Sequence, residues 1–152
     1  MKTNSKGFTL IELLAVIVIL AVIALIATPL IMGVIDDARK GSAKNGAYGY
    51  VKAVENTIAT EMIKDTTISP NATQATVGVI KFTPRNNDGS SGTEKEANVN
   101  YKGTKPASQS LKIVNGTVGS GSTITISGYS FEMDANGEWQ EVTEEEEVTE
   151  EE

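Results

Sequence analysis

The sequence predicts an α+β fold in which one long N-terminal helix packs on a small antiparallel sheet. Two patterns predict the helix: residues 8–35 are almost continuously apolar, and residues 36–65 carry apolar side chains at helical spacing. A third pattern predicts the sheet, because residues 66–142 contain short β-type runs separated by Asn, Gly and Ser turn signals. At 152 residues, the chain has room for one domain of ordinary size.

The apolar segment runs from Phe8 to Ile35 and follows a short basic stretch, MKTNSKG, at residues 1–7. A helix over its 28 residues would be about 42 Å long, enough to cross a hydrocarbon core of about 30 Å. A secretory signal peptide is disfavoured, because the run exceeds an h-region of about 7–15 residues and contains no A-x-A cleavage site. A plain membrane anchor explains the length and the leading lysines, but not Glu12 or Pro29.

Glu12 is the one ionisable side chain in this segment. A carboxylate costs roughly 2.5–3.5 kcal/mol at mid-depth in a bilayer and less near the interface, so an anchor alone would gain nothing from it. Pro29 lacks an amide proton and, with Gly33 one turn later, marks a helix break where the segment could kink or unwind on assembly. An ordinary kinked membrane helix is the alternative interpretation of this pair.

Residues 36–65 are predicted to continue the helix with one apolar face. Lys64 near the end suits the helix dipole, and Ser69-Pro70-Asn71 stops the helix. Glycines should make the junction between the two halves pliable, at roughly 1 kcal/mol per interior glycine relative to alanine. These glycines are Gly33, Gly41, Gly46 and Gly49, and the apolar face consists of Ala47, Val51, Val54, Ile58 and Met62.

The sheet is predicted from five short runs rich in β-branched and aromatic residues. Between the first two runs, residues 85–96 (RNNDGSSGTEKE) are predicted to form a mobile polar loop. The predicted strands are residues 77–83, 98–101, 111–114, 122–127 and 129–133.

Two Asn-Gly pairs predict hairpin turns in this region. They are Asn115-Gly116 and Asn136-Gly137, and the second joins residues 129–133 to the run EWQEV. Tyr129 and Trp139 then lie on neighbouring strands, where they could form an adhesive aromatic patch. Cross-strand packing is the interpretation that we favour, because it follows from the hairpin alone.

The chain contains no cysteine and no histidine. Disulfides, thiolate zinc sites, Ser-His-Asp catalysis and Cys-His catalysis are therefore excluded, which leaves carboxylate pairs or lysine chemistry as enzyme routes. We expect no enzyme activity, no cofactor and no metal centre.

Charge is distributed unevenly along the chain. Residues 132–152 hold 11 of the 20 acidic groups and none of the 13 basic groups, whereas residues 1–131 have 13 basic against 9 acidic groups, a net charge of +4. This excess has no Arg-rich stripe or aromatic interleaving, so no dedicated nucleic-acid site is expected. The glutamate run at residues 143–152 repels itself and is predicted to be a disordered tail.

Two further motifs have simple structural alternatives. Asp134, Asn136 and Glu138 place oxygen ligands at alternating positions, as calcium sites do, but the Asn-Gly turn explains the same residues. Asn71 and Asn115 each begin an N-x-T glycosylation sequon, although such three-residue matches are common and loops favour these residues anyway.

The stretch KGFTLIELL at residues 6–14 resembles the processing motif of type IV prepilins. In that family a short basic leader ends in Gly, a membrane-embedded peptidase cuts after it, and the new first residue, usually Phe, is N-methylated. The resemblance implies that Gly7 ends the leader, that Phe8 is methylated and that Glu12 is the family's acidic residue four positions later. Pro29 matches the helix-breaking proline that is common in the family.

The resemblance also implies the organisation of the chain. Many pilins close their last loop with a cysteine pair that this sequence lacks, so it is similar to the cysteine-free pilins of some Gram-positive bacteria. The implied segments are a cleaved leader (1–7), a transmembrane and filament-core helix (8–35), an amphipathic helix half (36–65), an antiparallel β head (66–142) and an acidic tail (143–152).

Physical reasons support the motif independently. Glycine lacks a Cβ, so the backbone at Gly7 can lie close against a protease. The cut frees an α-amine on Phe8, and N-methylation keeps its charge. An axially displaced neighbour can place that amine opposite Glu12 and so offset the cost of the carboxylate. A contact between Phe8 and Glu12 of one chain, one helical turn apart, is the competing interpretation.

The function implied by the resemblance is that of a structural subunit of a type IV pilus. The precursor would span the inner or cytoplasmic membrane once, and the mature chain would polymerise through its N-terminal helix into a cell-surface fibre. Its partners would be membrane lipid, identical subunits, a prepilin peptidase, an assembly ATPase and a membrane platform protein. Two alternatives stay open: a pseudopilin of a type II secretion or DNA-uptake apparatus, and a membrane-anchored binding module that never polymerises.

Overall fold

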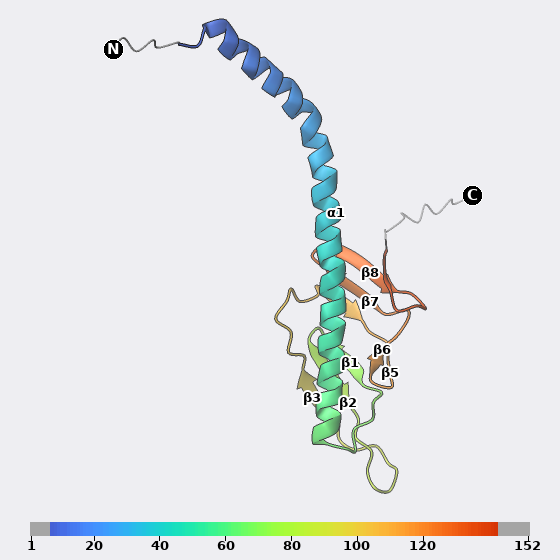
Figure 1. The fold of residues 1–152 in the computed structure, drawn as a ribbon. Coiled ribbons are helices and arrows are strands. Elements are labelled where there is room, and N and C mark those ends of the chain that lie inside the picture. The colour runs from blue at the N-terminus through green and yellow to red at the C-terminus, as the bar shows by residue number, and fades with distance from the viewer. Residues whose placement is uncertain (1–6, 143–152) are drawn as a thin grey trace, which may run out of the picture. The chain divides into compact units, whose positions relative to one another are not determined.

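The computed structural model describes residues 7–142, in which one helix, α1 (Leu10–Lys64), is followed by nine short strands (Figure 1). This is the predicted α+β arrangement of a long helix on small antiparallel sheets. Residues 1–6 of the predicted leader and the predicted disordered tail at 143–152 lie outside the described residues. The chain divides after Arg39 into two compact units, and α1 contributes to both.

In the first unit, residues 13–35 of α1 are apolar on every side of the helix. Its large side chains are exposed throughout, from Leu10 at 81% to Ile35 at 45%. By length and composition α1 can cross a membrane, and none of its most apolar stretch is buried in the protein. Because a surface of this size is unfavourable in water, it requires lipid or other chains as its environment.

Neither Pro29 nor Gly33 interrupts α1 in this structure. Pro29 removes only one backbone donor, the partner that the Leu25 carbonyl would otherwise have, and long helical runs on both sides hold the conformation. The Thr28 hydroxyl donates to the Ala24 carbonyl at 2.7 Å, one turn earlier. Kinking or unwinding of this stretch on assembly stays a prediction.

In the second unit, one face of α1 forms the centre of the core. The predicted apolar face is confirmed, because Ala47, Val51, Val54 and Ile58 are buried and Met62 packs against them at its edge. The face is wider than predicted, since Ala43 and Tyr50 are buried as well. The Tyr50 hydroxyl accepts a hydrogen bond from the backbone N–H of Gly78 at 2.9 Å, which explains how a tyrosine can be fully buried there.

Tyr101 explains two glycines that were predicted to make the helix pliable. Its ring lies edge-on to Tyr50, with the ring centroids 5.4 Å apart, and its hydroxyl donates to the Gly46 carbonyl at 3.1 Å. A Cβ added at Gly49 would lie 3.3 Å from the Tyr101 oxygen, and one added at Gly46 would lie 3.1 Å from the Ile126 side chain. These glycines admit neighbouring side chains, so packing accounts for them without any need for flexibility.

The strands form three antiparallel sheets rather than the single sheet predicted. Their orders are β1-β2-β3, β4-β7-β8-β9 and β5-β6. The strands are β1 (Thr73–Thr76), β2 (Val79–Phe82), β3 (Lys95–Asn98), β4 (Ser108–Ser110), β5 (Ile113–Val114), β6 (Thr117–Val118), β7 (Thr123–Ile126), β8 (Tyr129–Met133) and β9 (Trp139–Glu141).

The predictions for β2, β7 and β8 are confirmed within two residues at either end, and β5 covers half of the predicted run at 111–114. The strand predicted at residues 98–101 is wrong, because β3 ends at Asn98, where it pairs with Val79 of β2. The predicted loop at 85–96 is shorter for the same reason. β1 and β4 were missed because their polar sequences carry no hydrophobic alternation, and β6 was missed because its two residues are too few to show one.

Four tight turns connect the hairpins, and the first, between β1 and β2, contains Gly78 at φ 82°. Asn115 and Gly116 both have positive φ (53° and 79°), so the predicted turn between β5 and β6 is confirmed. Gly137, at φ 81°, closes the predicted turn between β8 and β9. Ser127 and Gly128 form a further positive-φ turn between β7 and β8, which the sequence analysis did not single out.

Trp139 belongs to the core. It is fully buried in β9 opposite Met133, and its backbone N–H donates to the Tyr48 hydroxyl at 3.1 Å. Tyr129 pairs with Ile126 and packs at the edge of the same core. Cross-strand packing in the terminal hairpin is therefore confirmed for Trp139, whereas Tyr129 pairs across the preceding hairpin, between β7 and β8. An adhesive surface built on Trp139 is excluded by its burial.

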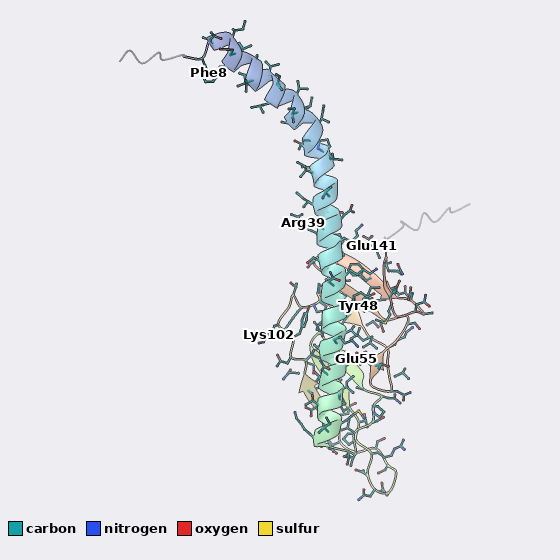
Figure 2. All side chains as sticks on the ribbon, in the orientation of Figure 1. Phe8, Arg39, Tyr48, Glu55, Lys102 and Glu141 are labelled. Carbon is teal, nitrogen blue, oxygen red and sulfur yellow. The ribbon has the colours of Figure 1, made fainter. Side chains whose placement is uncertain are left out.

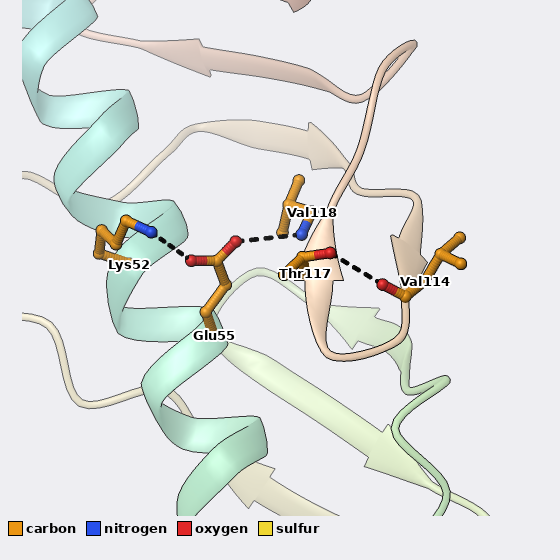
Figure 3. Close-up of polar contacts among 5 residues, drawn as sticks. All are labelled: Lys52, Glu55, Val114, Thr117 and Val118. Atoms are coloured by element: carbon orange, nitrogen blue, oxygen red, sulfur yellow. Dashed lines mark hydrogen bonds and ion pairs between the residues drawn. The ribbon is translucent and has the colours of Figure 1, made fainter. Parts of the chain in front are cut away.

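Polar contacts fix the β5–β6 hairpin to α1 (Figure 3). The Glu55 carboxylate accepts a bond from the Val118 backbone N–H at 3.2 Å and pairs with Lys52 at 2.7 Å. A second link joins Asn115 to the segment after the helix, because its backbone N–H donates to the Asn71 side chain at 2.9 Å. The side chain of the first sequon asparagine therefore already has a structural role.

Asp65 ties the end of α1 to β3, and this tie should make stability depend on pH. Hydrogen bonds from Lys95 and then from Thr67 lower the pKa of Asp65 from 3.8 to about 2. The stabilisation is complete above the unfolded pKa and disappears as the pH falls through the folded pKa. In detergent-solubilised full chain, the unfolding free energies of wild type and Asp65→Asn should differ at neutral pH and converge as the pH approaches about 2.

The effect should be modest because the pair is exposed to solvent. Lys95→Met, which removes the cation and keeps the carboxylate, should abolish most of the same pH dependence. If the unfolding free energy of the wild type exceeds that of Asp65→Asn by the same amount down to the lowest pH, this account is contradicted.

Candidate functional site

The predicted processing site begins at Gly7, just before α1. A Cβ built on Gly7 would meet nothing within 4 Å, and its φ is not in the left-handed region. The fold of the described chain therefore does not require glycine here. A glycine here does, however, leave room for another molecule to approach the backbone closely, as a protease would.

Phe8 lies outside the helix. Its side chain is 89% exposed, and α1 starts two residues later at Leu10. Phe8 therefore precedes the first helical turn, whereas Glu12 lies within it, and the two side chains still line one hollow. The contact between them within one mature chain stays an alternative prediction. The first helical turn begins between them, because Thr9 ends the non-helical segment.

Glu12 closes a capping box with Thr9, which the sequence analysis missed. Its carboxylate accepts bonds from the Thr9 backbone N–H at 2.8 Å and from the Thr9 hydroxyl at 2.6 Å. In return the Glu12 backbone N–H donates to the Thr9 hydroxyl at 3.3 Å. The T-x-x-E spacing ahead of an apolar run is the sequence signal for this motif. Glu12 therefore caps the N-terminus of α1 in addition to carrying a negative charge.

The carboxylate lies in an apolar setting without a cation. Phe8, Leu13, Ala15 and Val16 line a shallow hollow together with Glu12. Among the residues that the structure describes, no ion pair reaches Glu12. Two neutral-donor bonds satisfy part of its hydrogen-bonding capacity, and the negative charge remains uncompensated once lipid or protein excludes water.

The uncompensated Glu12 carboxylate makes this hollow suited to binding a cation. Cutting after Gly7 would create an α-amine on Phe8, at the exposed end of the same apolar helix. A second copy displaced along the helix axis could bring its own amine to the hollow around Glu12. The remaining sequence-predicted positions, Pro29 and Gly33, lie more than four helical turns further along α1 and take no part in this site.

The residues of the possible calcium motif form a turn, in which the Asp134 carboxylate already accepts hydrogen bonds. One oxygen of Asp134 accepts bonds from the backbone N–H groups of Asn136 and Glu138 at 2.8 and 2.9 Å, and the other accepts a bond from Gln140 at 3.0 Å. These bonds lower the pKa of Asp134, the Gln140 contact most. In the described part of the chain, no group of three acidic side chains is placed to hold a metal ion.

The family comparison selects the same N-terminal segment. Residues 2–28 match the family model for the prokaryotic N-terminal methylation motif. The match contains Gly7, Phe8, Thr9 and Glu12 together with most of the exposed apolar helix. The chain carries the type IV prepilin signature.

The prepilin signature covers 27 of the 152 residues and ends just before Pro29. It indicates prepilin processing and assembly, and it fits a precursor anchored in the membrane through its N-terminal apolar helix. No curated protein and no solved structure matches the chain. The second unit of the chain is therefore characterised by its own geometry alone.

Proposed function

We propose that this chain is a pilin, a non-enzymatic subunit of a type IV pilus. The precursor is cut between Gly7 and Phe8 by a prepilin peptidase, Phe8 is N-methylated, and the mature chain polymerises through its N-terminal helix. The observation that carries the proposal is the methylation motif at the start of a helix whose apolar side chains are exposed on all sides. Within this apolar segment, Glu12 is the single carboxylate.

The proposal assigns a role to each segment. Residues 1–7 are the removed leader, and residues 8–35 span the membrane first and form the filament core later. Residues 36–65 carry the apolar face that holds the head, residues 66–142, on the helix. Pro29 and Gly33 allow the helix to adjust during assembly. The precursor resides in the cytoplasmic or inner membrane, and the polymer lies at the cell surface.

Apolar burial is the main source of fibre stability in this proposal. Packing that removes on the order of 1,000 Å² of apolar surface from water would contribute about 25 kcal/mol per subunit before ordering costs. The free energy gained when the helix moves from lipid into the fibre is smaller, because acyl chains already solvate its apolar side chains. Extraction from the membrane therefore needs an assembly ATPase and a membrane platform protein as partners.

The test combines microscopy with mass spectrometry of the mature chain. We expect surface fibres that disappear when the coding sequence is deleted, and a purified subunit that begins at N-methylated Phe8. A mature chain with another first residue would refute the processing step. Loss of protein secretion or DNA uptake on deletion, with no visible fibre in the wild type, would instead identify a pseudopilin.

A further inference from the structure

The second half of the chain separates its charges into two blocks. Residues 97–131 contain three lysines and no Asp or Glu, whereas residues 132–152 contain 11 acidic groups and no Lys or Arg. The acidic block includes Glu132, Glu141 and the segment 143–152. Neighbouring charges of both signs are the usual arrangement on a soluble surface, so this separation calls for a physical role.

The fold places one part of each block at opposite edges of one sheet: residues 102–105 precede β4, and Glu141 lies in β9. In the order β4-β7-β8-β9, β4 and β9 are the edge strands. Residues 102–105 lead into β4, where Ala107 bonds to Thr125 of β7. At the other edge, β9 leads into the acidic segment 143–152. Figure 2 shows Lys102 and Glu141 on opposite sides of α1 in that view.

The lysines at the β4 edge are available for a partner. Lys102 and Lys105 are exposed, and in the described part of the chain neither forms an ion pair. Five other lysines of the same unit do form them, namely Lys40, Lys52, Lys64, Lys81 and Lys95. Among the described residues, Lys44 and Lys112 also lack one, but neither lies in the segment that leads into β4.

We propose that the acidic segment 143–152 of one copy binds the Lys102–Lys105 loop of the next copy, an inference that rests on the proposed fibre. In a two-fold dimer, the same patch of both copies meets at the axis, so an acidic patch would face an acidic patch and repel it. Pairing of opposite charges instead brings the acidic edge of one copy to the basic edge of the next. The copies then join head to tail, and a head-to-tail contact that does not close produces a helical filament. The contact thus links neighbouring heads outside the helical core.

Reach alone does not exclude binding within one copy. Ten residues extend at most about 33–36 Å, and four strands span about 14 Å. To reach its own loop, however, the segment would have to cross β8, β7 and β4. A neighbouring head can present its β4 edge directly to the β9 edge, so the contact between copies needs no such crossing.

The absence of cysteine makes disulfide cross-linking a clean test. Two full-length chains with different tags, one carrying Lys105→Cys and the other Glu147→Cys, are co-expressed in cells that assemble the fibre, and the fibres are oxidised. We expect a heterodimer that carries both tags, in severalfold higher yield than with Asn87→Cys in place of Lys105→Cys. Asn87 is an exposed control position in the loop between β2 and β3.

Each outcome is decisive. A heterodimer yield at the control level overturns the inference, as does a doubly substituted single chain that cross-links internally while the two-chain experiment gives no heterodimer. Fibres that form normally but show no cross-link leave the proposed function intact. If the unsubstituted chain forms no fibre at all, the proposed function fails and this inference with it.

Charge reversal supplies a second, independent measurement. Fibres of Lys102→Glu/Lys105→Glu should fall apart at lower salt than wild-type fibres, because the contact is electrostatic and screened by ions. Replacing glutamates of the acidic segment by lysine in the same chain should restore the salt resistance. Equal salt resistance in wild type and the charge-reversed variant would contradict the contact.

Discussion

Replacing Glu12 by Gln is expected to stop fibre assembly while leaving the chain inserted in the membrane. Glutamine can keep the capping box with Thr9, because Gln serves at this position as Glu does, but it removes the negative charge. The N-terminal amine of the neighbouring copy would then be buried without a partner. Loss of one member of a buried pair costs about 3–5 kcal/mol, which lowers the affinity between subunits by roughly a hundredfold to several thousandfold.

Thr9→Ala is the matched control for this prediction. It removes the hydroxyl that exchanges two bonds with Glu12 and leaves the charge in place. The expected cost is about 0.5–2 kcal/mol in the first turn of the helix, so fibres should still form. Fibre yield in both variants, normalised to membrane-inserted chain, gives the answer. Fibres from Glu12→Gln together with none from Thr9→Ala would show that Glu12 acts as a helix cap.

Gly7→Val should abolish production of the mature chain. A Cβ at this position meets nothing within 4 Å, so we expect folding and membrane insertion to be unaffected. It would nevertheless obstruct the close approach of the backbone to a peptidase. Mass spectrometry should therefore find only the full-length precursor, retained in the membrane, and electron microscopy should find no fibre.

Gly41→Ala is the control for the cleavage experiment. Gly41 lies within α1, and a Cβ there also meets nothing within 4 Å. This variant should be cut and methylated as the wild type is. Normal amounts of mature chain from Gly7→Val would show that the peptidase does not read this position, and the proposed cleavage site would be wrong.

The helix was predictable because its signals are local. Residues 8–35 are apolar without a break long enough to end a helix, and Ala47, Val51, Val54 and Ile58 repeat at three- and four-residue spacing. The predicted end near Asp65 differs by one residue from the observed end at Lys64. Local turn chemistry similarly predicted both Asn-Gly hairpins.

The sheets were predicted less completely because strands depend on distant partners. β3 contains Lys95 and Glu96, and its strand character comes from pairing with Lys81 and Phe82 of β2. No local pattern in TQAT or SQS marks β1 or β4. Cross-strand neighbours supply the stabilisation that such polar sequences lack by themselves.

For the candidate site, the sequence predicts the residues, and the structure adds the local geometry around them. Gly7, Phe8 and Glu12 follow from the motif, and the spacing from Phe8 to Glu12 suggested one helical turn. The helix starts at Leu10, however, so Glu12 bonds to Thr9. The T-x-x-E spacing of Thr9 and Glu12 is the sequence signal of the capping box, whereas the charge of Glu12 by itself predicts pairing with an amine.

The sequence by itself determined the membrane-length helix, its single carboxylate and the separation of charges, because these are properties of composition and local spacing. Only the tertiary structure decided which glycines are needed and where the charges lie. Gly46 and Gly49 admit Ile126 and Tyr101, whereas nothing contacts a Cβ at Gly33 or Gly41. Contacts between residues far apart in the chain depend on strand order and register, and these are set by the packing of the whole unit.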